Sequence, residues 1–241
     1  MTLVSALRAR GLVCLTGAGG KKTTLYALAR RLERPIVTAT VRIPVFDDRV
    51  ARVSVTDDPV AAVRAADDWP VGVVPAREGD RYLGYDPDVV ADLPAAGAAD
   101  DVLVKADGAR SRLFKAPGED EPRIPSAADT VIPVASVRAV GEPLSESHVH
   151  RPERVAALTG LSPGDAVGPA DVATVLAHPD GGLKHVPDGA TVVPLLNMVD
   201  DPALRETGEA VADALLAATD RVERVVLARM LADDPVVAVV A

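Results

Sequence analysis

Short apolar runs alternate along the chain with segments whose apolar residues recur at helical spacing. The runs that predict strands are Leu12–Leu15, Ile36–Thr40, Val53–Val55, Val71–Val74, Asp101–Ala106, Thr130–Ala135, Thr191–Leu196, Val222–Ala228 and Val236–Val240. Helical patterns cover Asp201–Asp220, Pro59–Asp67 and a segment whose apolar face is Leu25, Leu28, Ala29 and Leu32. Strands that alternate with helices predict βαβ units around a mostly parallel sheet.

We therefore predict a three-layer α/β fold, with ligands bound at the carboxyl ends of the strands. The length of 241 residues suits one domain over residues 1–241. Residues 151–177 have the pattern of two short helices joined by a Gly-Asp turn, so a helical insertion is expected at about residues 145–185. Pro133 and Pro194 interrupt their apolar runs, which predicts an edge strand or a strand end at each.

Charge and cysteine content narrow the classes of partner. The net charge is −9, which disfavours binding to nucleic acid or to an anionic membrane. The single cysteine, Cys14, excludes an intramolecular disulfide and a cysteine-rich metal site supplied by one chain. The N-terminus lacks the apolar region of a signal peptide, and no apolar run has membrane-spanning length. The chain is expected in the cytoplasm.

The stretch LTGAGGKKTT, Leu15–Thr24, joins a predicted strand to a predicted helix through three glycines. Unpaired N–H groups at a helix N-terminus attract anions, and glycines let the backbone approach phosphate oxygens. Lysine adds a mobile cation, and a threonine hydroxyl can ligate Mg²⁺. The candidate phosphate-binding residues are Gly17, Ala18, Gly19, Gly20, Lys21, Lys22, Thr23 and Thr24.

The spacing departs from the P-loop pattern G-x-x-x-x-G-K-[ST]. Leu15 stands at the first glycine if Lys21 is the phosphate lysine, and Lys22 then follows it in place of Ser or Thr. We favour Lys22 as the phosphate lysine because Thr23 follows it, which would make Thr23 a ligand of Mg²⁺. A glycine-rich turn with two solvated lysines is the alternative.

A dinucleotide-binding fingerprint also begins with glycines at the spacing of Gly17 and Gly19, but Lys22 occupies its third glycine position. No acidic residue follows the second predicted strand, where that fingerprint requires one. An NAD(P)-dependent oxidoreductase is therefore the less favoured function.

Two later strands end in residues suited to a nucleotide. Asp107 follows a predicted strand, as does the carboxylate that accepts from a Mg²⁺-bound water in phosphoryl-transfer sites. Asn197 and Asp200 form an N-x-x-D that resembles the base-reading N-K-x-D of GTP-binding proteins, because a carboxylate can accept two hydrogen bonds from guanine. Alternatively, Asp200 or Asp201 simply caps the long helix.

The segment 107–126 is long, polar and rich in positive charge. Arg110, Arg112 and Lys115 could bind phosphate or another oxyanion such as molybdate or selenophosphate, or they could pair with the acidic residues 119–121. His148 and His150 lack a third metal ligand nearby in the sequence.

Three blocks, GAGGKKTT, DGARSRLFKAPGEDEPRIP and HRPERVAALTG with LLNMVD, together resemble the YqeC family. The resemblance extends from about Leu12 to about Asp200. Its members are described as accessory proteins of selenium-dependent hydroxylases and are similar to P-loop nucleotide-binding proteins. The resemblance implies a P-loop-like fold and a role in maturing molybdenum-containing hydroxylases. It also implies that Lys115, Arg110 and Glu121 of the middle block belong to the site.

We therefore expect Mg²⁺-dependent binding of GTP or ATP with hydrolysis, in the service of molybdenum-hydroxylase maturation. Lys22, Asp107 and Arg110 are the candidate catalytic residues, and Thr23 with Asp107 would hold Mg²⁺. A molybdenum hydroxylase or its maturation factors would be the protein partner. The alternative is a non-hydrolytic carrier or adaptor that holds an oxyanion or a cofactor phosphate in the same loop.

Overall fold

The chain folds around one large, mostly parallel sheet in a computed structural model that describes residues 1–97 and 99–241. The sheet has ten strands in the order β15-β14-β13-β10-β1-β8-β2-β5-β4, with β12 beside β10. In that order the bounds are Val236–Val240, Val225–Ala228, Leu195–Asn197, Thr130–Ser136, Gly11–Gly17, Asp101–Lys105, Pro35–Ala39, Val71–Val74 and Arg52–Val55, and β12 is Thr191–Val192. Every pairing is parallel except that of β15 with β14, so the predicted α/β fold is confirmed.

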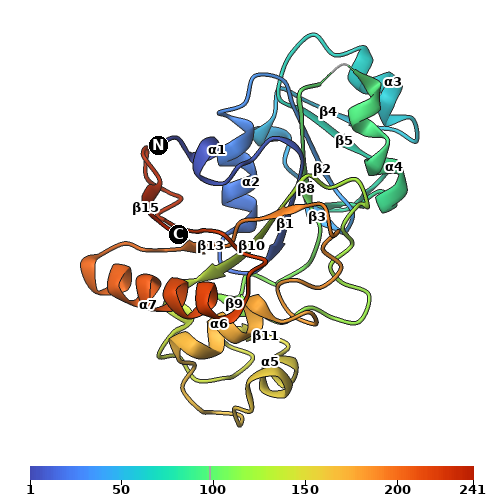
Figure 1. Cartoon of the computed structure of the whole chain (residues 1–241). Coiled ribbons are helices and arrows are strands. Elements are labelled where there is room, and N and C mark those ends of the chain that lie inside the picture. The colour runs from blue at the N-terminus through green and yellow to red at the C-terminus, as the bar shows by residue number, and fades with distance from the viewer. Residues whose placement is uncertain (98) are drawn as a thin grey trace.

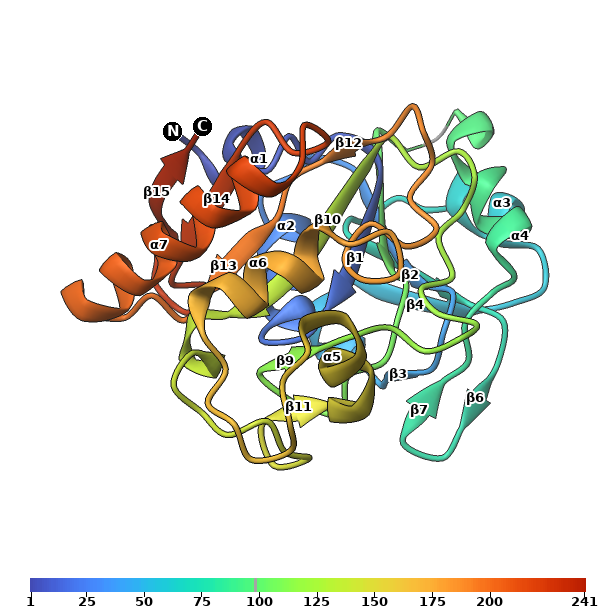
Figure 2. The ribbon, with the colours of Figure 1, turned by 60° about the horizontal axis from the view of Figure 1, so that its bottom comes forward.

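Helices cover both faces of this sheet (Figures 1 and 2). One face carries α1 (Leu3–Ala6) and α2 (Lys21–Ala29). The other carries α3 (Pro59–Arg64) and α4 (Pro87–Ala91) at one end, and α5 (Pro152–Thr159), α6 (Pro169–Ala177) and α7 (Pro202–Ala218) at the other. Short 3₁₀ helices lie at Asp47–Arg49, Leu93–Ala96 and Val137–Ala139. None of the helices in the described residues combines the length and apolarity of a membrane span.

The side chains of a strand alternate between the two faces of the sheet, and each face packs into a separate part of the core. Leu12 and Cys14 of β1 pack toward α3 and α4, whereas Val13 and Leu15 pack toward α1 and α2. Successive side chains of a strand point to opposite faces, so a run that is apolar at every position must be covered on both sides. Coverage on both sides explains why these strands appear in the sequence as continuous apolar runs.

Pro133 lies in a central strand, contrary to the prediction of an edge strand or strand end. Its strand β10 lies between β1 and the pair β12 and β13. β12 pairs with Thr130 and Val131, and β13 pairs with residues from Val134 onward, so no ladder partner faces Pro133 on that side. A proline, which has no N–H, is tolerated where the neighbouring strand is interrupted. Pro194 does mark a strand end, because it separates β12 from β13.

Two small sheets lie outside the large one. In the first, β9 (Phe114–Lys115) pairs with β11 (Val149–His150), which ties the polar segment 107–126 to the start of the helical insertion. The second is a three-stranded sheet of β3 (Ile43–Pro44), β7 (Arg81–Tyr82) and β6 (Arg77–Glu78). Helices α5 and α6 lie within the predicted insertion, and α6 packs on α7.

Candidate functional site

The glycine loop between β1 and α2 leaves the N-terminus of α2 without a side-chain cap. Gly17, Gly19 and Gly20 have φ angles of 84°, 83° and 136°, which favour glycine. Gly20 occupies the N-cap position, and among the described residues no side-chain cap bonds to the first N–H groups of the helix. These N–H groups and the helix dipole together make an anion-binding position.

Lys21, not Lys22, turns into the site. Lys21 is buried at 6% exposure, and its ammonium donates to the carbonyl oxygen of Gly17. Lys22 is exposed and lines an open cleft on another side of α2. This geometry favours Lys21 as the phosphate lysine over the predicted Lys22. Lys21 precedes Leu25 by four residues and Leu28 by seven, so it belongs to the buried face of the helix. This helical spacing was the sequence signal for Lys21, whereas the prediction gave more weight to the Lys22-Thr23 pair.

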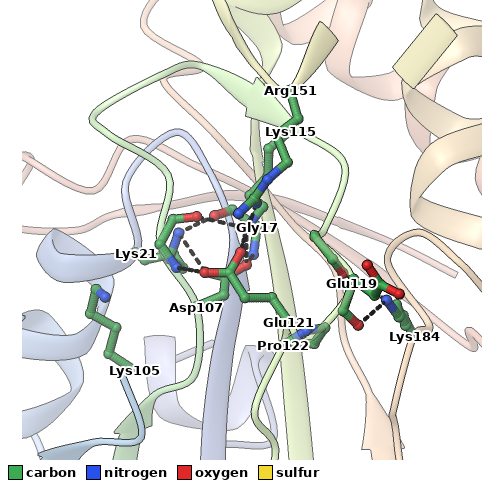
Figure 3. A network of polar contacts seen from close by, with 12 residues as sticks. Gly17, Lys21, Lys105, Asp107, Lys115, Glu119, Glu121, Pro122, Arg151 and Lys184 are labelled. Atoms are coloured by element: carbon green, nitrogen blue, oxygen red, sulfur yellow. Dashed lines mark hydrogen bonds and ion pairs between the residues drawn. The ribbon is translucent and has the colours of Figure 1, made fainter. Parts of the chain in front are cut away.

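Asp107 is the centre of a buried ion network (Figure 3). It follows β8, beside β1, and its side chain is 1% exposed. Its Oδ1 lies 2.8 Å from the Lys21 ammonium, and its Oδ2 lies 2.9 Å from the Lys115 ammonium. The N–H of Gly17 donates to Oδ2 at 2.8 Å. The carboxylate thus binds the glycine loop, α2 and the segment 107–126 to one another.

The network continues outward through Glu121. Its Oε2 lies 3.0 Å from the Lys115 ammonium and 2.7 Å from Nη1 of Arg151, and its Oε1 accepts from the N–H of Gly108. Arg151 has a φ of 61° and stands directly before α5. A residue of the helical insertion therefore completes the network.

The pKa values follow from the balance between burial and charge. Burial alone would raise the pKa of Asp107, but Lys21 and Lys115 outweigh it and hold this pKa below its usual range. Glu121 behaves alike: Lys115 and Arg151 overcome burial and lower its pKa to about 2. Burial lowers the pKa of Lys21 despite the nearby Asp107 charge. The network therefore holds both carboxylates ionised at neutral pH.

The segment 107–126 lies over the glycine loop. The N–H of Gly19 donates to the carbonyl oxygen of Arg112 at 2.9 Å, and the N–H of Ser136 donates to that of Leu113 at 3.0 Å. Lys184 fixes the far part of the segment by donating to the carbonyl oxygens of Gly118 and Glu119. Arg110 is exposed, with a φ of 45°.

The YqeC protein family matches residues 13–153 of the chain. Over 197 residues the chain is also 30% identical to the Escherichia coli (strain K12) protein named "Uncharacterized protein YqeC", covering 77% of this chain and 75% of that protein. The chain belongs to the YqeC family. No solved structure gives a significant match.

All members of the ion network lie within the part of the chain that matches the YqeC family. They are Gly17, Lys21, Asp107, Lys115, Glu121 and Arg151. The predicted Asn197 and Asp200 lie beyond residue 153, outside that match.

Asn197 and Asp200 make separate contacts. Asn197 is buried; its Nδ2 donates to the carbonyl oxygen of Gly19 at 2.8 Å, and its Oδ1 accepts from the N–H of Met230 at 3.1 Å. Asp200 is exposed and pairs with Arg138 at 2.7 Å. Both ends of the Asn197 amide are thus engaged by backbone, which favours a role in positioning the glycine loop over base reading.

Replacing Asn197 with alanine should therefore destabilise the fold. The carbonyl of Gly19 and the N–H of Met230 would lose their buried partner, at a cost of about 1–3 kcal/mol in the free energy of unfolding. Urea unfolding measures this loss. Asp200→Ala is the matched control, because its pair with Arg138 is exposed and should be worth under about 1 kcal/mol. Equal losses in the two variants would contradict the positioning role.

The two predicted Mg²⁺ ligands line different cavities. Thr23 lines the open cleft beside α2, whereas Asp107 lines a buried cavity of about 20 Å³. Ala18 and Thr24 are also buried, with the Ala18 N–H donating to Val134 and the Thr24 hydroxyl to the carbonyl oxygen of Gly20. In the described part of the chain, no three His, Cys, Asp or Glu side chains gather as a potential metal site.

Sequence reasoning missed two contributors near the network. Arg151 lies thirty residues from its partner Glu121, and only the tertiary fold reveals their contact. Lys105 is buried in β8, where it donates to the carbonyl oxygen of Arg42 at 2.9 Å. A lysine within the apolar run DVLVKA was the available signal, since lysine is rarely fully buried without a partner.

Proposed function

We propose that this member of the YqeC family binds a nucleoside triphosphate, GTP or ATP, as its Mg²⁺ complex. One observation carries the proposal: the uncapped N-terminus of α2 follows three glycines with positive φ and places Lys21 beside the buried Asp107. The strand β1 delivers this loop to the carboxyl edge of a parallel sheet, where α/β folds bind their ligands.

The charge balance of the network suits an anion. Three cationic side chains, Lys21, Lys115 and Arg151, face only two carboxylates, those of Asp107 and Glu121. A local excess of positive charge in a protein of net charge −9 indicates a site that attracts a negatively charged ligand.

A bound triphosphate would compete for Lys21. Its ammonium can serve a phosphate by exchanging the carbonyl oxygen of Gly17 for a phosphate oxygen, because the side chain already starts at the first position of α2. Asp107 would keep Lys115 and the N–H of Gly17 as partners. The phosphates would then lie on the first N–H groups of α2.

Mg²⁺ fits this site together with the nucleotide and not by itself. Mg²⁺ is usually held by one or two carboxylates, substrate phosphates and water. Asp107 is the carboxylate nearest the glycine loop, and two ammonium groups surround it. Phosphate oxygens would have to supply most of the ligands, and the metal would neutralise phosphate charge.

A non-hydrolytic carrier is the second candidate, and the state of the carboxylates favours it over a nucleotidase. Asp107 and Glu121 are both engaged in ion pairs, and the pKa of His150 is lowered to about 4 by burial and by Arg151. None of these three groups is poised to take a proton from an attacking water. Release of inorganic phosphate from GTP or ATP that disappears in Lys21→Gln would support hydrolysis instead.

The resemblance to accessory proteins supplies the biological part of the proposal, a role in maturing a molybdenum-containing hydroxylase. Cells that lack the chain should yield that hydroxylase with reduced activity. Wild-type protein should restore the activity and Lys21→Gln should not, provided that both proteins accumulate equally. Full hydroxylase activity without the chain would refute this role.

Two neighbouring lysines test nucleotide binding. Calorimetry with GTP, ATP and NADP, each with and without Mg²⁺, should detect one triphosphate. Lys21→Gln should weaken that binding at least about 10-fold, because a charged hydrogen bond is worth about 1.5–3 kcal/mol. Lys22→Gln is the matched control and should have the smaller effect. Tight binding of NADP alone would favour the oxidoreductase, and no binding at all would refute the proposal.

A further inference from the structure

An open cleft of about 680 Å³ runs beside α2, a volume suited to a small-molecule ligand. Three segments that are distant in the sequence form it. They are α2 with the two residues after it, the segment 44–49 that follows β3, and the segment 230–233 that follows β14. The cleft therefore lies where several strand ends and the helix meet.

The cleft runs along the exposed side of α2 from its first turn. Lys22 and Thr23, in the first turn of α2, line one end of it, and Arg30, directly after the helix, lines the other. The nine residues of α2 span about 13 Å at about 1.5 Å per residue. A ligand whose phosphates lie on the N-terminus of α2 could extend along this helix into the cleft.

One aromatic side chain, Tyr26, lines this cleft and belongs to a cluster with two buried aromatic rings. The chain has one Trp, three Tyr and two Phe, and Tyr26, Phe46 and Tyr82 form one cluster here. The ring centroids of Tyr26 and Phe46 are 6.2 Å apart, and those of Phe46 and Tyr82 are 5.4 Å apart. Phe46 and Tyr82 are buried, whereas Tyr26 is half-buried and lines the cleft. Tyr26 thus presents part of a ring on a rigid support.

Hydrogen-bond donors and acceptors line the cleft together with that ring. The guanidinium of Arg49 lies over the Tyr26 ring, 6.0 Å from its centroid, and pairs with Asp48. Arg31 donates to the carbonyl oxygens of Ala27 and Asp233. Lys22 and Arg30 are exposed and form no ion pair with the described residues. These two cations remain available to a ligand.

We infer that the cleft holds the nucleoside end of the nucleotide, with the base stacked on Tyr26. Arg30 would donate to the edge of the base or to a sugar hydroxyl. This inference rests on the proposed function and assigns base recognition to the cleft, because Asn197 and Asp200 are engaged elsewhere.

Comparing a nucleotide with inorganic tripolyphosphate tests the inference. Calorimetry with Mg²⁺ would measure both ligands on wild type, Tyr26→Leu and Arg30→Ala, with Arg154→Ala on α5 as an exposed control. Tyr26→Leu should raise the Kd of the nucleotide about 5- to 100-fold, the usual range for a lost base stack, and change that of tripolyphosphate less than about 2-fold. Arg30→Ala should change the two affinities in the same selective way.

Other outcomes separate the two proposals. If the nucleotide binds and Lys21→Gln weakens it, but both cleft variants bind it like wild type, the cleft assignment is overturned and the phosphate site stands. Equal weakening of nucleotide and tripolyphosphate would also overturn it. If wild type binds no nucleotide, the proposed function fails and the cleft assignment fails with it.

Discussion

Replacing Asp107 with asparagine should lower the free energy of unfolding by about 3–5 kcal/mol, because the change leaves buried positive charge without its counterion. The ammonium of Lys21 would lose the carboxylate 2.8 Å away, and Lys115 would keep Glu121 as its carboxylate and the carbonyl oxygen of Gly108. Asparagine preserves the size of the side chain and an acceptor for the N–H of Gly17, so the loss reports mainly on charge. Urea unfolding followed by circular dichroism measures it.

An exposed ion pair and a double variant test whether the loss in Asp107→Asn comes from buried charge. Asp86→Asn breaks an ion pair with Arg123 whose side chains are 60% and 41% exposed, and it should cost less than about 1 kcal/mol. Adding Lys21→Met to Asp107→Asn should recover part of the lost stability, because it removes one uncompensated charge. If Asp107→Asn costs no more than Asp86→Asn, the network does not stabilise the fold as described.

Lys105→Met should stabilise the protein at neutral and acidic pH. Burial, with a further contribution from the positive charge of Lys21, lowers the pKa of Lys105 from 10.5 to about 7. Its described hydrogen-bond partner is a neutral carbonyl oxygen, that of Arg42. Forcing this group to carry a charge in the folded state therefore opposes folding, and methionine should raise the free energy of unfolding at pH 6 by roughly 2–4 kcal/mol.

The pH dependence of this stabilisation shows whether charge or packing causes it. Between about pH 7 and pH 10.5 the unfolded chain holds the Lys105 proton and the folded chain does not, so the contribution of Lys105 to stability rises with pH. The advantage of Lys105→Met should thus be largest below pH 7 and shrink toward pH 10. Thermal unfolding at several pH values measures it, with Lys22→Met as the exposed control. A constant advantage across this range would show that packing and not charge is responsible.

The candidate site was predictable to the extent that it is local in sequence. The glycine loop, the helix that follows it and Asp107 at a strand end all appear in the sequence as short patterns, and the structure contains them. The sequence favoured Lys22, whereas the structure turns Lys21 toward Asp107, because adjacent helical residues point about 100° apart and only one of them can face the sheet. The pairing of Asn197 with Gly19 joins residues 178 positions apart, which no local pattern reveals.

The sequence by itself determined the alternation of strands and helices, the parallel sheet and the glycine loop at its carboxyl edge. Hydrophobic periodicity and glycine content act within a few residues, so these features can be derived without coordinates. Only the tertiary structure decided which cations surround Asp107, where Pro133 is tolerated, and which segments border the cleft beside Tyr26. The physical reason is that burial, ion pairing and cleft shape depend on elements brought together by strand order, and strand order is a property of the whole fold.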